Sequence, residues 1–80
     1  MTTPPFFLVY RVEFFASGYG FTHLGLYTKL KDALHRAEQY IEFTGLPLAV
    51  VPRTLGAHVR YEPTRDVDYC RVDIHYEVYR

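Results

Sequence analysis

The sequence predicts a two-layer α+β domain in which one helix packs against an antiparallel sheet. Apolar residues alternate with other residues near both ends of the chain, a pattern typical of strands that bury one face. A central segment instead repeats its apolar residues three and four positions apart, which predicts an amphipathic helix. The predicted order of the elements is strand-strand-helix-strand-strand-strand. With the helix packed across one face of the sheet, the two kinds of apolar surface bury each other.

The chain has 80 residues, of which 18% are aromatic. This length predicts a single domain, residues 1–80, with residues 1–5 as a disordered lead-in that contains two prolines. Aromatic side chains can supply the core of so small a domain, because each one buries roughly 150–250 Å². The single cysteine, Cys70, excludes an internal disulfide, and we expect it to be buried.

The first two strands are predicted over residues 6–15 and 21–28. In the first strand the even-numbered residues are expected to face the core. The glycines of the segment 17–20 suit the loop of a hairpin, and they place Tyr19 at its tip. In the second strand the residues expected to point inward are Leu24 and Leu26, and those expected to point outward are His23, Gly25 and Tyr27.

The helix is predicted over residues 28–44. Thr28 is suited to cap its first turn, Gly45 to end it in a left-handed conformation, and Pro47 to prevent its continuation. One stripe of the helix is apolar and is expected to face the sheet; it consists of Leu30, Ala33, Leu34, Ala37, Tyr40 and Ile41.

The last three strands are predicted over residues 48–51, 57–62 and 67–80. A tight turn that begins at Pro63 would pair the last two of them, and it would place Arg60 opposite Tyr69. The same turn pairs Glu62 with Val67 and His58 with Arg71. It also puts four apolar residues on one face: Val59, Tyr61, Cys70 and Val72.

The opposite face of this hairpin carries ionisable residues: His58, Arg60, Glu62, Arg71, Asp73, His75 and Glu77. A histidine between two carboxylates, with His58 on the neighbouring strand, has the donors for a divalent metal or for acid–base catalysis. We favour the alternative, in which the charges solvate an open sheet face and pair across strands. No convincing nucleophile accompanies them. We therefore predict a protein that is not an enzyme, with no metal and no other cofactor.

Binding to another protein is the function that the sequence favours. Tyr19 lies in a glycine loop, where an aromatic side chain has little structural role. Tyrosine is also a common anchor residue at protein interfaces. Outward apolar residues exceed what a solvated face needs. An unpaired edge of either terminal strand would also accept a partner strand or a second copy, which would make a homodimer. The candidate binding residues are Phe7, Phe15, Tyr19, Tyr27, Arg60, Tyr69, Arg71, Asp73, His75 and Glu77.

A sheet that binds single-stranded nucleic acid is the first alternative, since bases stack on exposed aromatic rings next to arginine. Its outward aromatic residues would be Phe7, Phe15, Tyr27, Tyr69 and Tyr79. However, nine Lys and Arg balance nine Asp and Glu, so the formal net charge is zero and general attraction to phosphate is missing. Nucleic acid is therefore not favoured. A small metal-dependent enzyme is the second alternative, and it would use His58, Asp73, His75 and Glu77.

We expect a cytoplasmic protein with no membrane partner. The first five residues lack the basic region and apolar core of a signal peptide. No stretch approaches the roughly 18 apolar residues that a membrane-spanning helix needs.

The first half of the chain resembles small uncharacterised domains of phage and bacterial genomes. The resemblance lies in Phe-Leu-Val-Tyr-Arg-Val at 7–12, Leu-Gly-Leu-Tyr-Thr at 24–28 and the helix that follows over 31–41. In those domains a hairpin with a Gly-x-Tyr/Phe-Ser/Thr step leads into an alanine-rich helix. Phage proteins of this size include stoichiometric inhibitors of host machinery, such as anti-CRISPR proteins. The resemblance thus implies an inhibitor or adaptor, but it transfers no site residue and names no target.

Overall fold

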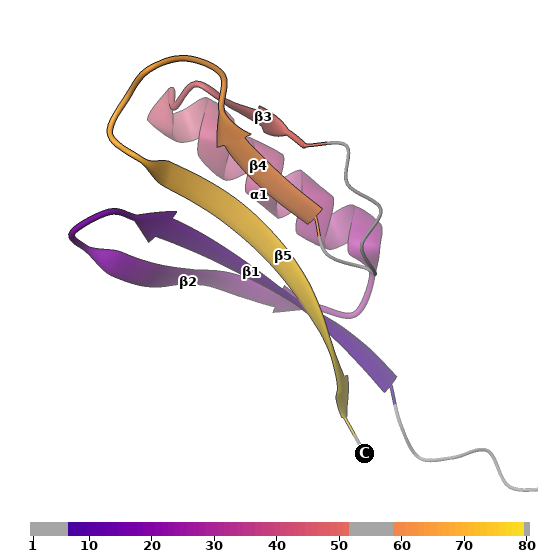
Figure 1. Ribbon diagram of the computed structural model, residues 1–80. Coiled ribbons are helices and arrows are strands. Elements are labelled where there is room, and N and C mark those ends of the chain that lie inside the picture. Colours follow the sequence, from indigo (N-terminus) through magenta and orange to yellow (C-terminus); the bar gives the residue numbers. More distant parts are fainter. Residues whose placement is uncertain (1–6, 52–58, 80) are drawn as a thin grey trace, which may run out of the picture.

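The computed structural model describes residues 7–51 and 59–79. Within them are the strands β1 (Phe7–Ala16), β2 (Gly20–Tyr27), β3 (Leu48–Val50), β4 (Val59–Pro63) and β5 (Cys70–Tyr79), and the helix α1 (Leu30–Thr44). The strands form one antiparallel sheet, and α1 lies across one of its faces (Figure 1). The predicted α+β fold class and the order of its elements are confirmed. No helix in the described part of the chain is both long and apolar enough to cross a membrane.

The sheet order is β2-β1-β5-β4-β3, which places the two terminal strands in its interior. β5 pairs with β1 from Ala16↔Cys70 to Phe7↔Tyr79, and its first half also pairs with β4. The strands that we expected to offer an edge are thus paired with each other. The outer strands of the described sheet are β2 and β3.

The core lies between α1 and the centre of the sheet. Val12, Val72 and Ile74 are fully buried there against Ala33 and Ala37 of the helix. The two alanines let the helix approach the sheet closely, and larger side chains close the periphery. These are Tyr10, Phe14, Leu24, Tyr27, Leu34, Tyr40, Ile41, Leu48 and Val59. Cys70 is also buried, as predicted.

The prediction for the C-terminal end of α1 is confirmed, whereas that for its N-terminal end is wrong. Gly45 adopts a φ of 70° and its N–H donates to the carbonyl of Ile41 at 2.9 Å, so the predicted left-handed end is confirmed. The predicted cap, Thr28, is wrong. The N-cap position is one residue later, at Lys29, whose side chain makes no capping hydrogen bond.

A β-bulge in the first hairpin overturns the predicted orientation of two residues. Val12 pairs with Gly25 whereas Glu13 pairs with His23, so Leu24 is an extra residue in β2. The alternation therefore shifts after Leu24. Leu26 is 53% exposed, whereas Tyr27 packs against the core, which is the reverse of the prediction.

The register between β4 and β5 also differs from the prediction. Arg60 pairs with Asp73, not with Tyr69, because the connection between the strands is longer than a tight turn. The difference is an even number of residues, so the paired residues keep their predicted faces. The predicted partner of Arg71, His58, lies outside the described residues. The observed register places opposite charges directly across from each other.

Candidate binding face

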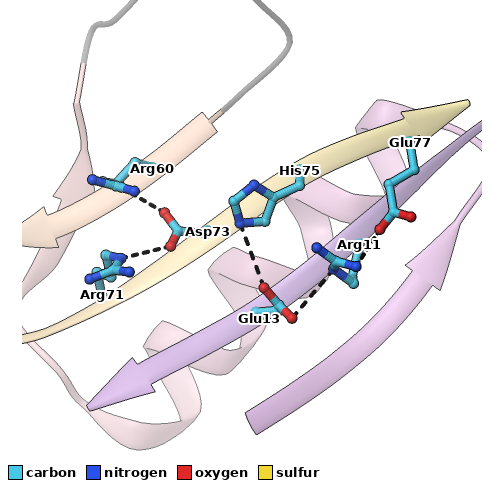
Figure 2. Close-up of polar contacts among 7 residues, drawn as sticks. All are labelled: Arg11, Glu13, Arg60, Arg71, Asp73, His75 and Glu77. Atoms are coloured by element: carbon cyan, nitrogen blue, oxygen red, sulfur yellow. Dashed lines mark hydrogen bonds and ion pairs between the residues drawn. The ribbon is translucent and has the colours of Figure 1, made fainter. Parts of the chain in front are cut away.

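The sheet face turned away from α1 carries the ionisable residues, and we call it the open face. Figure 2 shows that they come from the three middle strands and point to the same side. Apart from His58, which lies outside the described residues, the predicted group from β4 and β5 lies there. Arg11 and Glu13 of β1 join it, because they pair with His75 and Asp73 of β5. These two were not among the candidate binding residues, since nothing local indicates that the terminal strands are neighbours.

Asp73 lies between two arginines at the centre of the open face. The Nε atoms of Arg60 and Arg71 each donate to a different oxygen of its carboxylate, both at 2.7 Å. The Asp73 side chain is only 1% exposed. Burial alone would raise the pKa of Asp73, but the hydrogen bonds from Arg71 and Arg60 outweigh it and hold this pKa below its ordinary value. Asp73 is therefore a charged residue that fixes both guanidinium groups.

A second ionic group lies further along β5. Arg11 forms ion pairs with Glu13 and with Glu77, and Nε2 of His75 lies 3.6 Å from a carboxylate oxygen of Glu13 (Figure 2). Among the described residues, Arg11 has two carboxylate partners, whereas Asp73 has two guanidinium partners. Glu62 is a more distant carboxylate, 3.9 Å from Arg60. The open face is therefore richer in carboxylates around Arg11 and richer in guanidiniums around Asp73.

Three aromatic rings border the arginine-rich end of the open face. The ring of Phe15 lies 4.9 Å from that of Phe21 and 6.2 Å from that of Tyr69. The guanidinium carbon of Arg71 lies 4.4 Å from the centre of the Phe15 ring and 5.7 Å from the other two. We call Phe15, Phe21, Tyr69 and Arg71 the aromatic–arginine cluster. Phe21 was missed by the sequence reasoning, although its hairpin partner Phe15 was a candidate.

The ionic groups and the aromatic–arginine cluster meet in one shallow hollow of about 390 Å³. Side chains from β1, β2, β4 and β5 line it: Arg11, Glu13, Phe21, Arg60, Arg71, Asp73 and His75. The hollow therefore presents guanidinium groups, carboxylates and an aromatic ring to whatever enters it.

The other candidate residues lie elsewhere. Tyr19 is 90% exposed at the tip of the β1–β2 hairpin, where Gly18 turns the chain with a φ of 87°. Phe7 stacks on Tyr79 at the far end of the β1–β5 pair, with ring centres 5.9 Å apart. Tyr27 was predicted to be outward and instead packs against the core. The candidates thus divide among the hollow with its border, two positions remote from the hollow, and the core side of the sheet.

The described residues considered for a metal are Asp73, His75 and Glu77. Among residues 7–51 and 59–79, the structure has no group of three or more His, Cys, Asp or Glu side chains that could hold a metal ion. Both oxygens of Asp73 accept hydrogen bonds from guanidinium groups, whose positive charge opposes a cation at that place. His58 lies outside the described residues.

We compared the chain with family models, with curated proteins and with solved structures, and none of the three comparisons gave a match. The resemblance of its first half to phage and bacterial domains therefore stays an expectation.

Proposed function

We propose that this chain is a small non-catalytic protein-binding module whose open face contacts the partner. The observation that carries the proposal is the aromatic–arginine cluster. Phe21 and Tyr69 are 58% and 41% exposed, next to an arginine held in place by Phe15 and Asp73. Aromatic residues and arginine are enriched at the centres of protein interfaces, where they supply most of the binding energy.

The rigidity of the cluster supports this proposal. Arg71 is restrained by the Phe15 ring on one side and by the Asp73 carboxylate on the other. A side chain that is already ordered loses little conformational entropy on binding, so more of its contact energy contributes to affinity. Exposed rings beside a fixed guanidinium therefore form a prepared contact surface.

Single-stranded nucleic acid is the competing ligand, because the rings of Phe21 and Tyr69 could also stack on bases. The charges argue against it. Arg11 forms ion pairs with the carboxylates of both Glu13 and Glu77, so a strand of phosphates that ran along β5 would meet repulsion there. The charge balance of the whole chain adds no further attraction. We therefore favour a protein partner.

A module of this kind acts by occupying a surface of its target. We accordingly propose a stoichiometric inhibitor or adaptor that acts in the cytoplasm. The phage resemblance suggests such a role, while the choice of the open face depends only on its side chains.

The proposal is tested by light scattering on the purified chain, alone and after mixing with lysate fractions of the cells in which it occurs. We expect one larger complex with a protein. Phe21→Ala and Tyr69→Ala should each weaken it about tenfold or more. Phe43→Ala is the matched control, because Phe43 is 88% exposed on α1, across the sheet from the open face.

Two results would contradict the proposal. One is a complex that both open-face variants form as well as the unaltered chain does. The other is salt-sensitive binding of an oligo(dT) strand that Phe21→Ala abolishes, which would assign the open face to nucleic acid instead.

A further inference from the structure

We infer that the open face binds a segment of the partner that carries an aspartate or glutamate next to an apolar residue. The carboxylate would lie between Arg60 and Arg71, and the apolar side chain would lie on Phe21 and Tyr69. This inference rests on the proposed function and names the chemistry of the partner.

Arg60 and Arg71 retain hydrogen-bond donors that they do not use for Asp73. A guanidinium has five N–H groups, and each of these arginines uses its Nε–H for Asp73. The Arg60 and Arg71 side chains are 31% and 19% exposed, and both line the hollow. Nη1 of Arg60 also lies 3.9 Å from a carboxylate oxygen of Glu62, and Arg71 has a further side-chain hydrogen bond with Tyr69. The remaining Nη N–H groups provide donors for an incoming oxyanion, in the planar geometry that suits a carboxylate.

The charges around Asp73 favour a further anion. Among the described residues, Arg60 and Arg71 both contact the Asp73 carboxylate, so these three side chains together carry an excess of positive charge. Glu62 reduces this excess only weakly, because it lies 3.9 Å from Arg60 and is 34% exposed to screening solvent. A single carboxylate from a partner would complete the pairing.

The charges further along β5 favour a single carboxylate over a polyanion as the ligand. The neighbouring group around Arg11 contains Glu13 and Glu77 and has an excess of negative charge. A nucleic-acid strand that ran along β5 would bring phosphates against these carboxylates. A peptide meets no such restriction, since it can place one acidic residue at the arginines and an uncharged or basic residue beyond.

Two exposed rings can contact the apolar residue of the partner segment. Phe21 lines the same hollow as the two arginines and is 58% exposed. The rings of Phe21 and Tyr69 both lie next to that of Phe15. An apolar side chain next to the acidic one would cover these rings and exclude water from the ion pair. Removing water strengthens the charge-assisted hydrogen bonds, so the two contacts support each other.

The test is selection of a random linear peptide library, displayed on phage, against the full chain. We expect enriched peptides with Asp or Glu beside an apolar residue. A synthetic version of the best peptide should bind at least about tenfold more weakly when its acidic residue is replaced by the amide. This comparison leaves the protein unchanged, so it does not depend on the folding of any variant.

Variants of the chain locate the contact. Arg71→Lys keeps the charge but loses the planar donors, and it should weaken binding of the acidic peptide. Glu62→Gln removes the competing carboxylate and should tighten binding about two- to fivefold. Phe43→Ala should leave the affinity unchanged.

The outcomes distinguish this inference from the proposed function. If enriched peptides lose binding with Phe21→Ala but tolerate the acid-to-amide replacement, the inference is wrong and the proposed function stands. If no enriched peptide depends on Phe21, Tyr69 or Arg71, both are wrong.

Discussion

At the scale of single residues, Asp73 organises the open face because it holds two arginines from two strands. It is buried on the central strand, and both carboxylate oxygens accept hydrogen bonds from guanidinium groups. We expect Asp73→Ala to lower the free energy of unfolding by about 1–3 kcal/mol, below the full cost of breaking a buried pair, because Arg60 and Arg71 can turn towards solvent. Urea denaturation measures this change. Asp66→Asn, at an exposed loop position, is the control and should change little.

The same carboxylate gives the fold a dependence on acid. The folded protein holds the pKa of Asp73 below its ordinary value, so near and below about pH 4 the unfolded chain binds the proton more readily. The stabilisation by Asp73 is therefore complete above that range and is lost as the pH falls through the folded pKa. Urea denaturation at a series of pH values should show this loss as a decrease in the free energy of unfolding at acidic pH. In Asp73→Asn this decrease should be smaller. An equally large decrease in both proteins would contradict the assignment to Asp73.

At the scale of elements, the bulge in β2 depends on Gly25. A Cβ atom at this position would lie 2.7 Å from the Tyr27 ring, which folds back over the glycine, and the φ of 155° is one that other residues rarely adopt. Gly25→Ala should therefore lower the free energy of unfolding by about 1–3 kcal/mol. Gly18→Ala also replaces a glycine of positive φ, but a Cβ there meets no atom within 4 Å, so its cost should be smaller.

A double variant separates the two causes at Gly25. If contact with the ring dominates, Gly25→Ala should cost clearly less when Tyr27 is replaced by Ala, because the contact is then gone. An unchanged cost would assign the effect to backbone conformation alone. Thermal or urea denaturation of the four proteins of the cycle gives the answer.

The same bulge shows what local sequence patterns could predict. Alternation and three-four spacing located each strand and the helix, because these patterns depend on neighbours along the chain. They failed at Leu26 and Tyr27, where one extra residue shifts the alternation, and in the register of Arg60. A bulge and a register are set by pairing with another strand, and the side chains of one strand alone do not specify them.

At the scale of the whole molecule, the sheet order decides which residues form the site. The row of charges on β5 was predicted from its alternation. Arg11, Glu13 and Phe21 were not among the candidate binding residues, because they join the charges of β5 only when β1 lies between β2 and β5. This arrangement depends on how the two ends of the chain meet, which no local pattern indicates.

Because β2 is an outer strand of the described sheet, its edge is one at which another chain could pair. Its bulge interrupts the edge, and Nε of Arg36 in α1 donates to the carbonyl of Leu24, the extra residue, at 3.1 Å. Bulges and charged side chains are common means by which proteins keep an edge from pairing with another chain. We therefore expect Arg36→Ala to expose this carbonyl and to increase self-association, measured as the mass from light scattering over a range of concentrations. Lys31→Ala, at an exposed position of the same helix, is the control. If Arg36→Ala keeps the mass of the unaltered chain at every concentration, the bulge alone is enough to protect this edge.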